Sequence, residues 1–256
     1  MYKKKSLGQH FLNPGAHTHA IAEAVEIVPG ELVVEIGPGE GVLTRELLER
    51  GARVIVVEKD SRLIPFLTET FRDEVQSGQL QIIEGDALEF ALPKKLQTSV
   101  YKVVGNIPYY ITGALLRAFL SAKHQPKTLV FLIQKEVAER IARSKKESLL
   151  SLSVKAYGEP QYIKTVPRGA FSPAPKVDSA VLRVRDISRA NFKNKLTEQR
   201  FFDLIHAGFA QKRKLLVRNL ENVLGTKAPE ALQQAGIPQN ARAEDVPLEQ
   251  WLHLTN

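Results

Sequence analysis

Cysteine is absent from all 256 residues of the chain. Disulfide bonds, thiolate metal sites and cysteine nucleophiles are therefore excluded. No apolar run approaches the ~18 residues that a membrane-spanning helix needs, so we expect no membrane span. The six histidines are scattered along the chain, and we predict no metal site from them.

An excess of positive charge is the main feature of the composition. Lysine and arginine outnumber aspartate and glutamate by 36 to 28, which suits a polyanionic partner such as a nucleic acid. The basic start of the chain is not followed by the apolar segment of a signal peptide. With 43% hydrophobic residues the chain can form an ample core, and we expect a cytoplasmic enzyme.

Apolar runs that alternate with segments of helical periodicity indicate an α/β fold. We predict five strands in a Rossmann-like, doubly wound parallel sheet, at residues 32–36, 53–57, 80–83, 100–104 and 128–133. Two more runs, 149–157 and 179–184, alternate in the manner of paired edge strands. The strand pattern then stops. The predicted domains are therefore 1–186 and a small, all-helical domain at 187–256.

A glycine-rich turn follows the first predicted strand. Its spacing, Gly37-x-Gly39-x-Gly41, is one residue shorter than the dinucleotide fingerprint. Glycines at such a turn let the backbone approach a cofactor closely. The next two strands end in carboxylates: Glu58 can accept both ribose hydroxyls of a nucleoside, and Asp86 can accept from its adenine amino group. Capping of helices by these two carboxylates is the alternative interpretation.

Further carboxylates beside this turn favour one cofactor over another. Glu35 and Glu40 would repel the pyrophosphate of NAD, whereas S-adenosylmethionine carries no phosphate and bears a positive sulfonium. We therefore predict S-adenosylmethionine as the cofactor. A NAD-dependent dehydrogenase is the less favoured interpretation.

The stretch Gly105-Asn106-Ile107-Pro108-Tyr109-Tyr110 is the candidate reactive centre. It lies between a predicted strand and a predicted helix, where open α/β sheets place their ligands. The side-chain oxygen of Asn106 and the carbonyl of Pro108 can accept hydrogen bonds from the amino group of a planar base, and Tyr109 can stack on its ring. A turn built from common turn residues is the alternative.

Several motifs occur together in a fixed order. They are Gly8-Gln9-His10-Phe11-Leu12, Val34-Glu35-Ile36-Gly37-Pro38-Gly39-Glu40-Gly41, Glu58, Glu84-Gly85-Asp86-Ala87, the Asn106 stretch and Phe171-Ser172-Pro173-Ala174-Pro175-Lys176-Val177-Asp178-Ser179. Over residues 5–224 they resemble the ribosomal RNA adenine N6,N6-dimethyltransferase family. The resemblance implies that the cofactor is bound by His10, Leu12, Gly37, Glu58, Asp86 and Asn106. His10 stands where many relatives have Asn, and either side chain can hydrogen-bond the cofactor.

The resemblance also implies a reaction and a substrate. The reaction is dimethylation, at N6, of two adjacent adenosines in a hairpin near the 3′ end of small-subunit (16S) rRNA, with a role in small-subunit biogenesis. Asn106 and Pro108 would orient the amino nitrogen, Tyr109 would stack on the flipped base, and Phe171 is the candidate for its opposite face. The expected partners are the assembling small subunit and its rRNA, and we expect a monomer.

A cluster of basic residues toward the C-terminus is the candidate RNA-binding surface. Lys212, Arg213, Lys214 and Arg218 lie within one amphipathic stretch, whose apolar residues would pack and leave the cations for phosphates. The stretch also resembles the C-terminal helix of the family. A solvated helix face is the alternative for an isolated run of this kind.

Two other functions stay open on the sequence alone. Large-subunit rRNA methyltransferases that confer macrolide resistance share the catalytic motifs, and residues 209–220 favour the small-subunit branch. A non-catalytic ribosome-assembly factor could keep the fold, although the intact motifs argue against lost activity.

Overall fold

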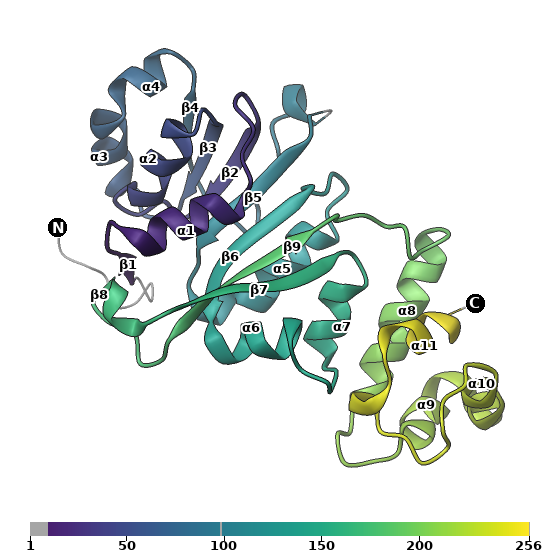
Figure 1. Ribbon diagram of the computed structural model, residues 1–256. Helices are drawn as coiled ribbons and strands as arrows, with labels where there is room; N and C mark the ends of the chain where they lie inside the picture. Colours follow the sequence, from purple (N-terminus) through teal and green to yellow (C-terminus); the bar gives the residue numbers. More distant parts are fainter. Residues whose placement is uncertain (1–9, 98, 256) are drawn as a thin grey trace. The chain divides into compact units, whose positions relative to one another are not determined.

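The structure, a computed structural model, describes residues 10–97 and 99–255. Within it the chain forms two compact units (Figure 1). The first contains the chain up to Ala138 together with Gln161–Ile187, and the second contains Glu139–Pro160 and the chain from Ser188 onward. The first unit ends at Ile187, one residue after the predicted boundary. The second unit also contains Glu139–Pro160, which the sequence analysis assigned to the first domain. A division into domains that fold independently stays a prediction.

A seven-stranded sheet forms the centre of the first unit, in the order β4-β3-β2-β5-β6-β9-β7. Its strands are β2 (Leu32–Ile36), β3 (Arg53–Glu58), β4 (Leu80–Glu84), β5 (Tyr101–Asn106), β6 (Thr128–Gln134), β7 (Glu159–Val166) and β9 (Ser179–Arg185). The first five pair in parallel, which confirms the predicted Rossmann-like arrangement, and β9 runs antiparallel to β6. The strand order reverses between β2 and β5, and such a switch point is where open α/β sheets bind ligands.

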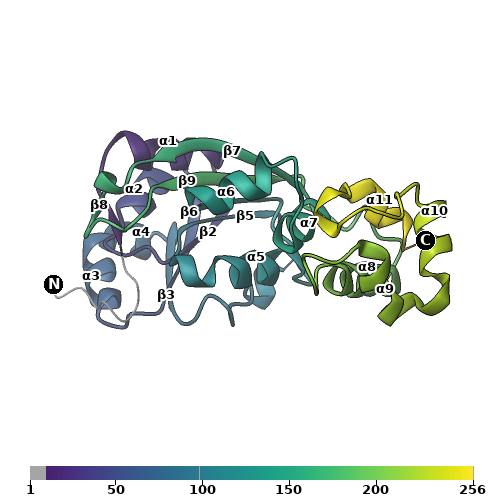
Figure 2. The same ribbon diagram turned by 90° about the horizontal axis from the view of Figure 1, so that it is seen from below.

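The parallel strands are apolar on both faces because helices cover both. All five residues of β2 and six of the seven in β6 are buried, which explains why they appear in the sequence as continuous apolar runs. The covering helices include α1 (Ala16–Ala24), α2 (Val42–Glu49), α3 (Leu63–Thr70), α4 (Arg72–Gln76), α5 (Thr112–Leu120) and α6 (Lys135–Ala142). Figure 2 shows α1 and α5 on opposite faces of the sheet. A two-stranded ribbon of β1 (Phe11–Leu12) and β8 (Phe171–Ser172) completes this unit.

One predicted edge strand is a helix. Residues 149–157 were expected to be extended, but Leu149–Lys155 forms α7. Its start is fixed by a capping box, in which the backbone N of Ser151 donates to Ser148 Oγ at 3.0 Å and the backbone N of Ser148 donates to Ser151 Oγ at 2.7 Å. The strand beside β9 is β7 instead. Half of its residues are exposed and three of the eight are only partly buried, so it lacks the apolar run that marks the central strands.

The second unit is helical, as predicted for the C-terminal part of the chain. Besides α7 it contains α8 (Lys195–Gly208), α9 (Leu216–Leu224), α10 (Ala228–Gln234) and α11 (Leu248–His253). The rings of Phe192, Phe201 and Phe202 cluster around Tyr157, with centroids 5.2–6.3 Å apart. Trp251 is fully buried and stacks on Phe209 at 6.0 Å. Aromatic packing therefore holds this unit together.

Gly208, the last residue of α8, is expected to be intolerant of a side chain. A Cβ atom there would lie 2.3 Å from Cη2 of Trp251 and 3.0 Å from Cδ1 of Leu216. Replacing Gly208 by alanine should lower the free energy of unfolding by about 2 kcal/mol, because overpacking strains the core. The control is Gly113→Ala in α5, where the added methyl meets open space and should be neutral or stabilising by about 0.5 kcal/mol. Urea unfolding of the two variants measures the difference, and equal stabilities would contradict the packing described.

Candidate functional site

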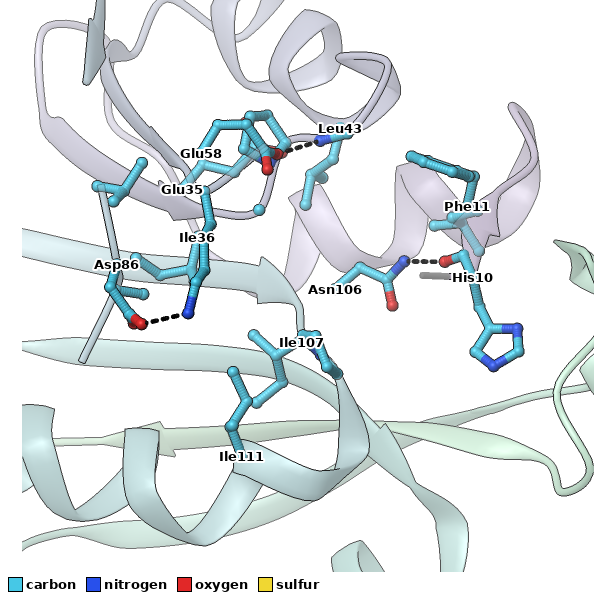
Figure 3. Close-up of a pocket in the computed structure, with 18 of the residues that line it drawn as sticks. His10, Phe11, Glu35, Ile36, Leu43, Glu58, Asp86, Asn106, Ile107 and Ile111 are labelled. Atoms are coloured by element: carbon cyan, nitrogen blue, oxygen red, sulfur yellow. Dashed lines mark hydrogen bonds and ion pairs between the residues drawn. The ribbon is translucent and has the colours of Figure 1, made fainter. Parts of the chain in front are cut away.

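A cavity of about 330 Å³ opens at the carboxyl ends of β2, β3 and β5 (Figure 3). Every cofactor-binding residue expected from the sequence lines it: His10, Leu12, Gly37, Gly39, Glu58, Asp86 and Asn106. Pro108 and Tyr109 line it as well. The volume lies in the range of small-molecule binding sites. The cavity therefore brings together residues that are almost a hundred positions apart in the sequence.

The glycine-rich turn forms one wall of the cavity. Gly37, Gly39 and Gly41 all have positive φ values, of 64°, 58° and 80°, a conformation that strains other residues. Gly39 has a second reason to be glycine, since a Cβ atom there would lie 2.8 Å from the ring of Phe11. Phe11 was not predicted as a site residue, and only the three-dimensional structure places it against this turn.

Glu58 organises the turn as well as facing the cavity. Its side chain is 5% exposed. Oε2 accepts a hydrogen bond from the backbone N of Gly39 at 3.3 Å, and Oε1 accepts from the backbone N of Asp60 at 2.8 Å. Burial raises the pKa of this carboxyl. Because a carboxylate oxygen can accept more than one hydrogen bond, both oxygens can still accept from a ligand.

Glu35, at the end of β2, is the most deeply buried carboxyl of the cavity wall. It is 1% exposed, and Oε2 accepts a hydrogen bond from Thr44 Oγ1 at 2.6 Å. Burial raises its pKa from 4.5 to about 8. Glu35 is therefore mainly protonated at pH 7, so this part of the wall carries less negative charge than the sequence suggests.

The raised pKa of Glu35 predicts a pH-dependent stability. Since the folded protein holds the proton to about pH 8 while the unfolded chain loses it near pH 4.5, the free energy of unfolding should fall as the pH rises between these values. The slope from this one group is at most about 1.4 kcal/mol per pH unit. Glu35→Gln should abolish this contribution, so that the variant gains stability relative to the wild type between pH 5 and pH 8, as measured by urea unfolding. Glu84→Gln, at an exposed carboxylate, controls for the substitution itself. Parallel pH profiles for wild type and Glu35→Gln would contradict the prediction.

Asp86 is paired with a lysine that the sequence did not single out. Lys59 Nζ lies 2.7 Å from Asp86 Oδ2, and the backbone N of Leu88 donates to Oδ1 at 2.9 Å. The pair with Lys59 lowers the pKa of Asp86. These contacts hold the carboxylate charged and fixed in orientation at the cavity, as a hydrogen-bond acceptor for a ligand.

Asn106, the last residue of β5, is held with its oxygen free. Its Nδ2 donates to the carbonyl oxygen of His10 at 2.8 Å (Figure 3), and among the described residues Oδ1 has no partner. The carbonyl of Pro108 accepts one hydrogen bond, from the backbone N of Ile111 at 3.2 Å, and keeps a second acceptor position. Two oxygens at this loop therefore each keep a free acceptor position.

The segment His10–Leu12 is fastened to the proline-rich loop as well as to Asn106. Phe11 and Leu12 pair with β8, and His10 Nδ1 lies 2.8 Å from the carbonyl oxygen of Pro173. Beyond the ribbon, the backbone N of Asn13 donates to the carbonyl of Ala170 at 2.9 Å. These bonds keep the segment at the cavity wall.

The two predicted stacking residues differ in position. Tyr109 lines the cavity, and its hydroxyl lies 2.6 Å from Ser179 Oγ. Phe171 is 4% exposed, packs in the hydrophobic core and is not among the described residues that line the cavity. Its ring would have to leave the core to stack on a base. In this structure Phe171 lies in β8 and pairs with Leu12 of β1.

The predicted basic surface is a turn rather than one helix. Helix α8 ends at Gly208, and Lys212, Arg213 and Lys214 lie exposed between α8 and α9. Arg218 lies in α9, where it pairs with Glu221 at 2.8 Å. The helix breaks because Asn219 Nδ2 donates to the carbonyls of Gly208 and Gln211, which fixes the turn.

Within residues 10–97 and 99–255, no three histidine or carboxylate side chains converge on a possible metal ion. No helix in the same part of the chain is long and apolar enough to span a membrane.

Comparison with known proteins gives a consistent result. The sequence model of the family described as "Ribosomal RNA adenine dimethylase" matches residues 1–256. A Ribosomal RNA small subunit methyltransferase A of Dehalococcoides mccartyi is 42% identical, over 98% of this chain and 87% of that protein. The protein of the same name from Deinococcus radiodurans is also 42% identical, over 95% of this chain and 82% of its own length. Among solved structures, the 23S rRNA methyltransferase ErmE has a TM-score of 0.78 at 30% identity, covering 96% of this chain and 98% of that one. A dimethyladenosine transferase from Plasmodium falciparum has the same TM-score at 25% identity, covering 96% of each chain.

Proposed function

Since the chain belongs to the ribosomal RNA adenine dimethylase family, we propose that it dimethylates, at N6, two adjacent adenosines in the hairpin near the 3′ end of small-subunit rRNA. Family membership confirms the resemblance predicted from the motifs and makes the chain an rRNA methyltransferase. The proposal of the small subunit is supported by the names of relatives 42% identical to this chain. The expected partner is the assembling small subunit in the cytoplasm, bound by a monomer.

The cofactor of this proposal is S-adenosylmethionine, which supplies an electrophilic methyl group when bound. The residues of the cavity fit it. Glu58 offers both oxygens to ribose hydroxyls, and Asp86 offers a fixed carboxylate to an adenine amino group. The glycine turn lets the backbone come close to the ligand. Glu35 adds little to the negative charge of this wall because burial raises its pKa to about 8. Glu40 and Asp86 still favour a cationic cofactor over one with a pyrophosphate.

The observation that carries the proposed chemistry is the free oxygen of Asn106. The amino nitrogen of adenine is a poor nucleophile because its lone pair is delocalised into the ring. Hydrogen bonds from this amino group to Asn106 Oδ1 and to the Pro108 carbonyl favour a pyramidal nitrogen and direct its lone pair. Tyr109 stacks on the flipped base. The methylated nitrogen is acidic enough to lose its proton to solvent, so positioning is the main contribution of the protein.

A large-subunit substrate is the second candidate. It is favoured by the likeness to the 23S rRNA methyltransferase ErmE, which covers nearly the whole chain. Because both groups share this fold, the sheet and the cavity do not separate them. The higher identity to proteins named as small-subunit methyltransferases supports the first candidate.

Methyl transfer to immature ribosomal subunits tests the proposal directly. The purified protein is incubated with tritiated S-adenosylmethionine and either immature small or immature large subunits, and the labelled nucleosides are then analysed. We expect dimethyladenosine in small-subunit RNA alone. Label only in large-subunit RNA would support the second candidate instead. Tight subunit binding without any label would indicate a non-catalytic assembly factor.

A further inference from the structure

Tyr109 is tied at its hydroxyl end to a residue that does not line the cavity. The Tyr109 hydroxyl lies 2.6 Å from Ser179 Oγ, at a distance typical of a short O–H···O hydrogen bond. Ser179 is fully buried and comes 70 residues later in the chain. It is the last residue of the motif that begins at Phe171, and no role was predicted for it individually.

The position of Ser179 is fixed by the central sheet. It is the first residue of β9, where it pairs with Gln134 of β6. The preceding residue, Asp178, is anchored as well, because its carbonyl accepts from the backbone N of Lys135 at 3.0 Å and its Oδ1 accepts from the backbone N of Arg168 at 3.0 Å. Ser179 Oγ therefore has a fixed position, from which a hydrogen bond can hold the ring of Tyr109.

The neighbouring tyrosine differs from Tyr109 in its exposure. Tyr110, which follows directly in the same short 3-10 turn, is 72% exposed, whereas Tyr109 is partly buried and its pKa is raised by that burial. Among the described residues, the only ring that stacks near Tyr109 is that of His10. The two ring centroids lie 6.3 Å apart, and the ring planes are 23° from parallel. The hydroxyl bond is thus the main directional contact on the Tyr109 ring.

We propose that Ser179 is a positioning residue, whose Oγ holds the ring of Tyr109 in the orientation that stacks on the flipped adenine. This inference rests on the proposed function. Stacking stabilises a bound base most when the partner ring already has the stacking orientation. Ordering a free ring on binding would cost conformational entropy and so reduce the stabilisation. Removal of the bond should therefore leave RNA and cofactor binding nearly intact and affect mainly the step in which the reacting nitrogen is aligned.

Kinetics of Ser179→Ala and Tyr109→Phe, which remove the two halves of the same bond, provide the first test. Each should lower kcat about tenfold, because small misplacements of reacting groups are costly, while KM for RNA and Kd for S-adenosylmethionine change less than about twofold. The double variant should be no slower than either single variant. Ser151→Ala, which removes another fully buried serine hydroxyl with hydrogen bonds, is the matched control and should keep the wild-type kcat even if its stability falls.

A spectroscopic readout separates positioning from general destabilisation. The target adenosine of a hairpin RNA is replaced by 2-aminopurine, whose fluorescence is quenched when it stacks on an aromatic ring. Tyr109→Ala defines the unstacked signal. Ser179→Ala should shift the fluorescence of the bound RNA toward that value, and Ser151→Ala should match the wild type.

The outcomes distinguish this inference from the proposed function. If wild type methylates the hairpin but Ser179→Ala keeps its kcat and its fluorescence, the positioning role is overturned and the proposed function stands. Additive losses in the double variant would also overturn it, since the two hydroxyls would then act separately. If wild type methylates neither the hairpin nor immature small subunits, the proposed function fails first.

Discussion

Replacement of Asn106 by alanine is expected to lower kcat by about a thousandfold, the upper range for removal of one group that stabilises the transition state. The Kd for S-adenosylmethionine should change less than about tenfold, since a tenfold change is about what the loss of one neutral hydrogen bond produces. The physical reason is that the two polar atoms of the amide have different partners. Its nitrogen donates to the His10 carbonyl at 2.8 Å, which leaves its oxygen able to accept from the amino group of the proposed substrate. Single-turnover methylation measures the chemical step, and calorimetric titration measures cofactor affinity.

Two further variants sharpen this test. Asn106→Asp keeps an acceptor oxygen but replaces the donor to His10 by an oxygen that repels its carbonyl, so we expect activity between those of alanine and wild type. Asn191→Ala removes another amide whose Nδ2 donates to a backbone carbonyl, that of Ala156, at 2.9 Å. It should keep the wild-type kcat. Equal losses of turnover and cofactor affinity in Asn106→Ala would mean that this residue serves the cofactor rather than the adenine.

The sequence predicted which residues lie together at this wall of the cavity because its signals are local. Gly37, Gly39 and Gly41 have positive φ values that few other residues tolerate. Glu58 is the last residue of β3, and Asp86 lies two residues after the end of β4. In a parallel sheet such positions meet at one edge by geometry alone. Their convergence on one cavity therefore needed no knowledge of side-chain packing.

Contacts between distant segments could not be predicted in this way. Lys59 meets Asp86 only because β3 and β4 pair in a register that sets Glu58 beside Glu84. Ser179 meets Tyr109 only because β9 inserts next to β6. Nothing in the local sequence of Lys59 or Ser179 distinguishes it from other lysines or serines.

Local signals also competed with one another. The residues of α7 alternate like a strand, but the capping box at Ser148 starts a helix there. The basic stretch is amphipathic at helical spacing, yet α8 stops at Gly208, and Leu215, which was expected to pack, is 40% exposed. In the second case the hydrogen bonds of Asn219 to the carbonyls of Gly208 and Gln211 fix the turn.

Replacement of Glu58 by alanine should weaken S-adenosylmethionine binding by about a hundredfold to ten-thousandfold, since hydrogen bonds to charged groups contribute roughly 1.5–3 kcal/mol each and Glu58 can accept two. The loss has a second source in the protein itself, because the backbone N of Gly39 loses its acceptor and the glycine turn loses a fixed support.

Glu58→Gln keeps one acceptor oxygen and should bind the cofactor with intermediate affinity. The matched control is Glu84→Ala, which removes the exposed carboxylate directly beside Glu58 in the register of β3 and β4 and should bind as wild type does. Calorimetric titration of all three variants gives the affinities. If Glu84→Ala weakened binding as much as Glu58→Ala, the effect would come from the net charge at this edge of the sheet, and the assignment of Glu58 to the ribose would have to be abandoned.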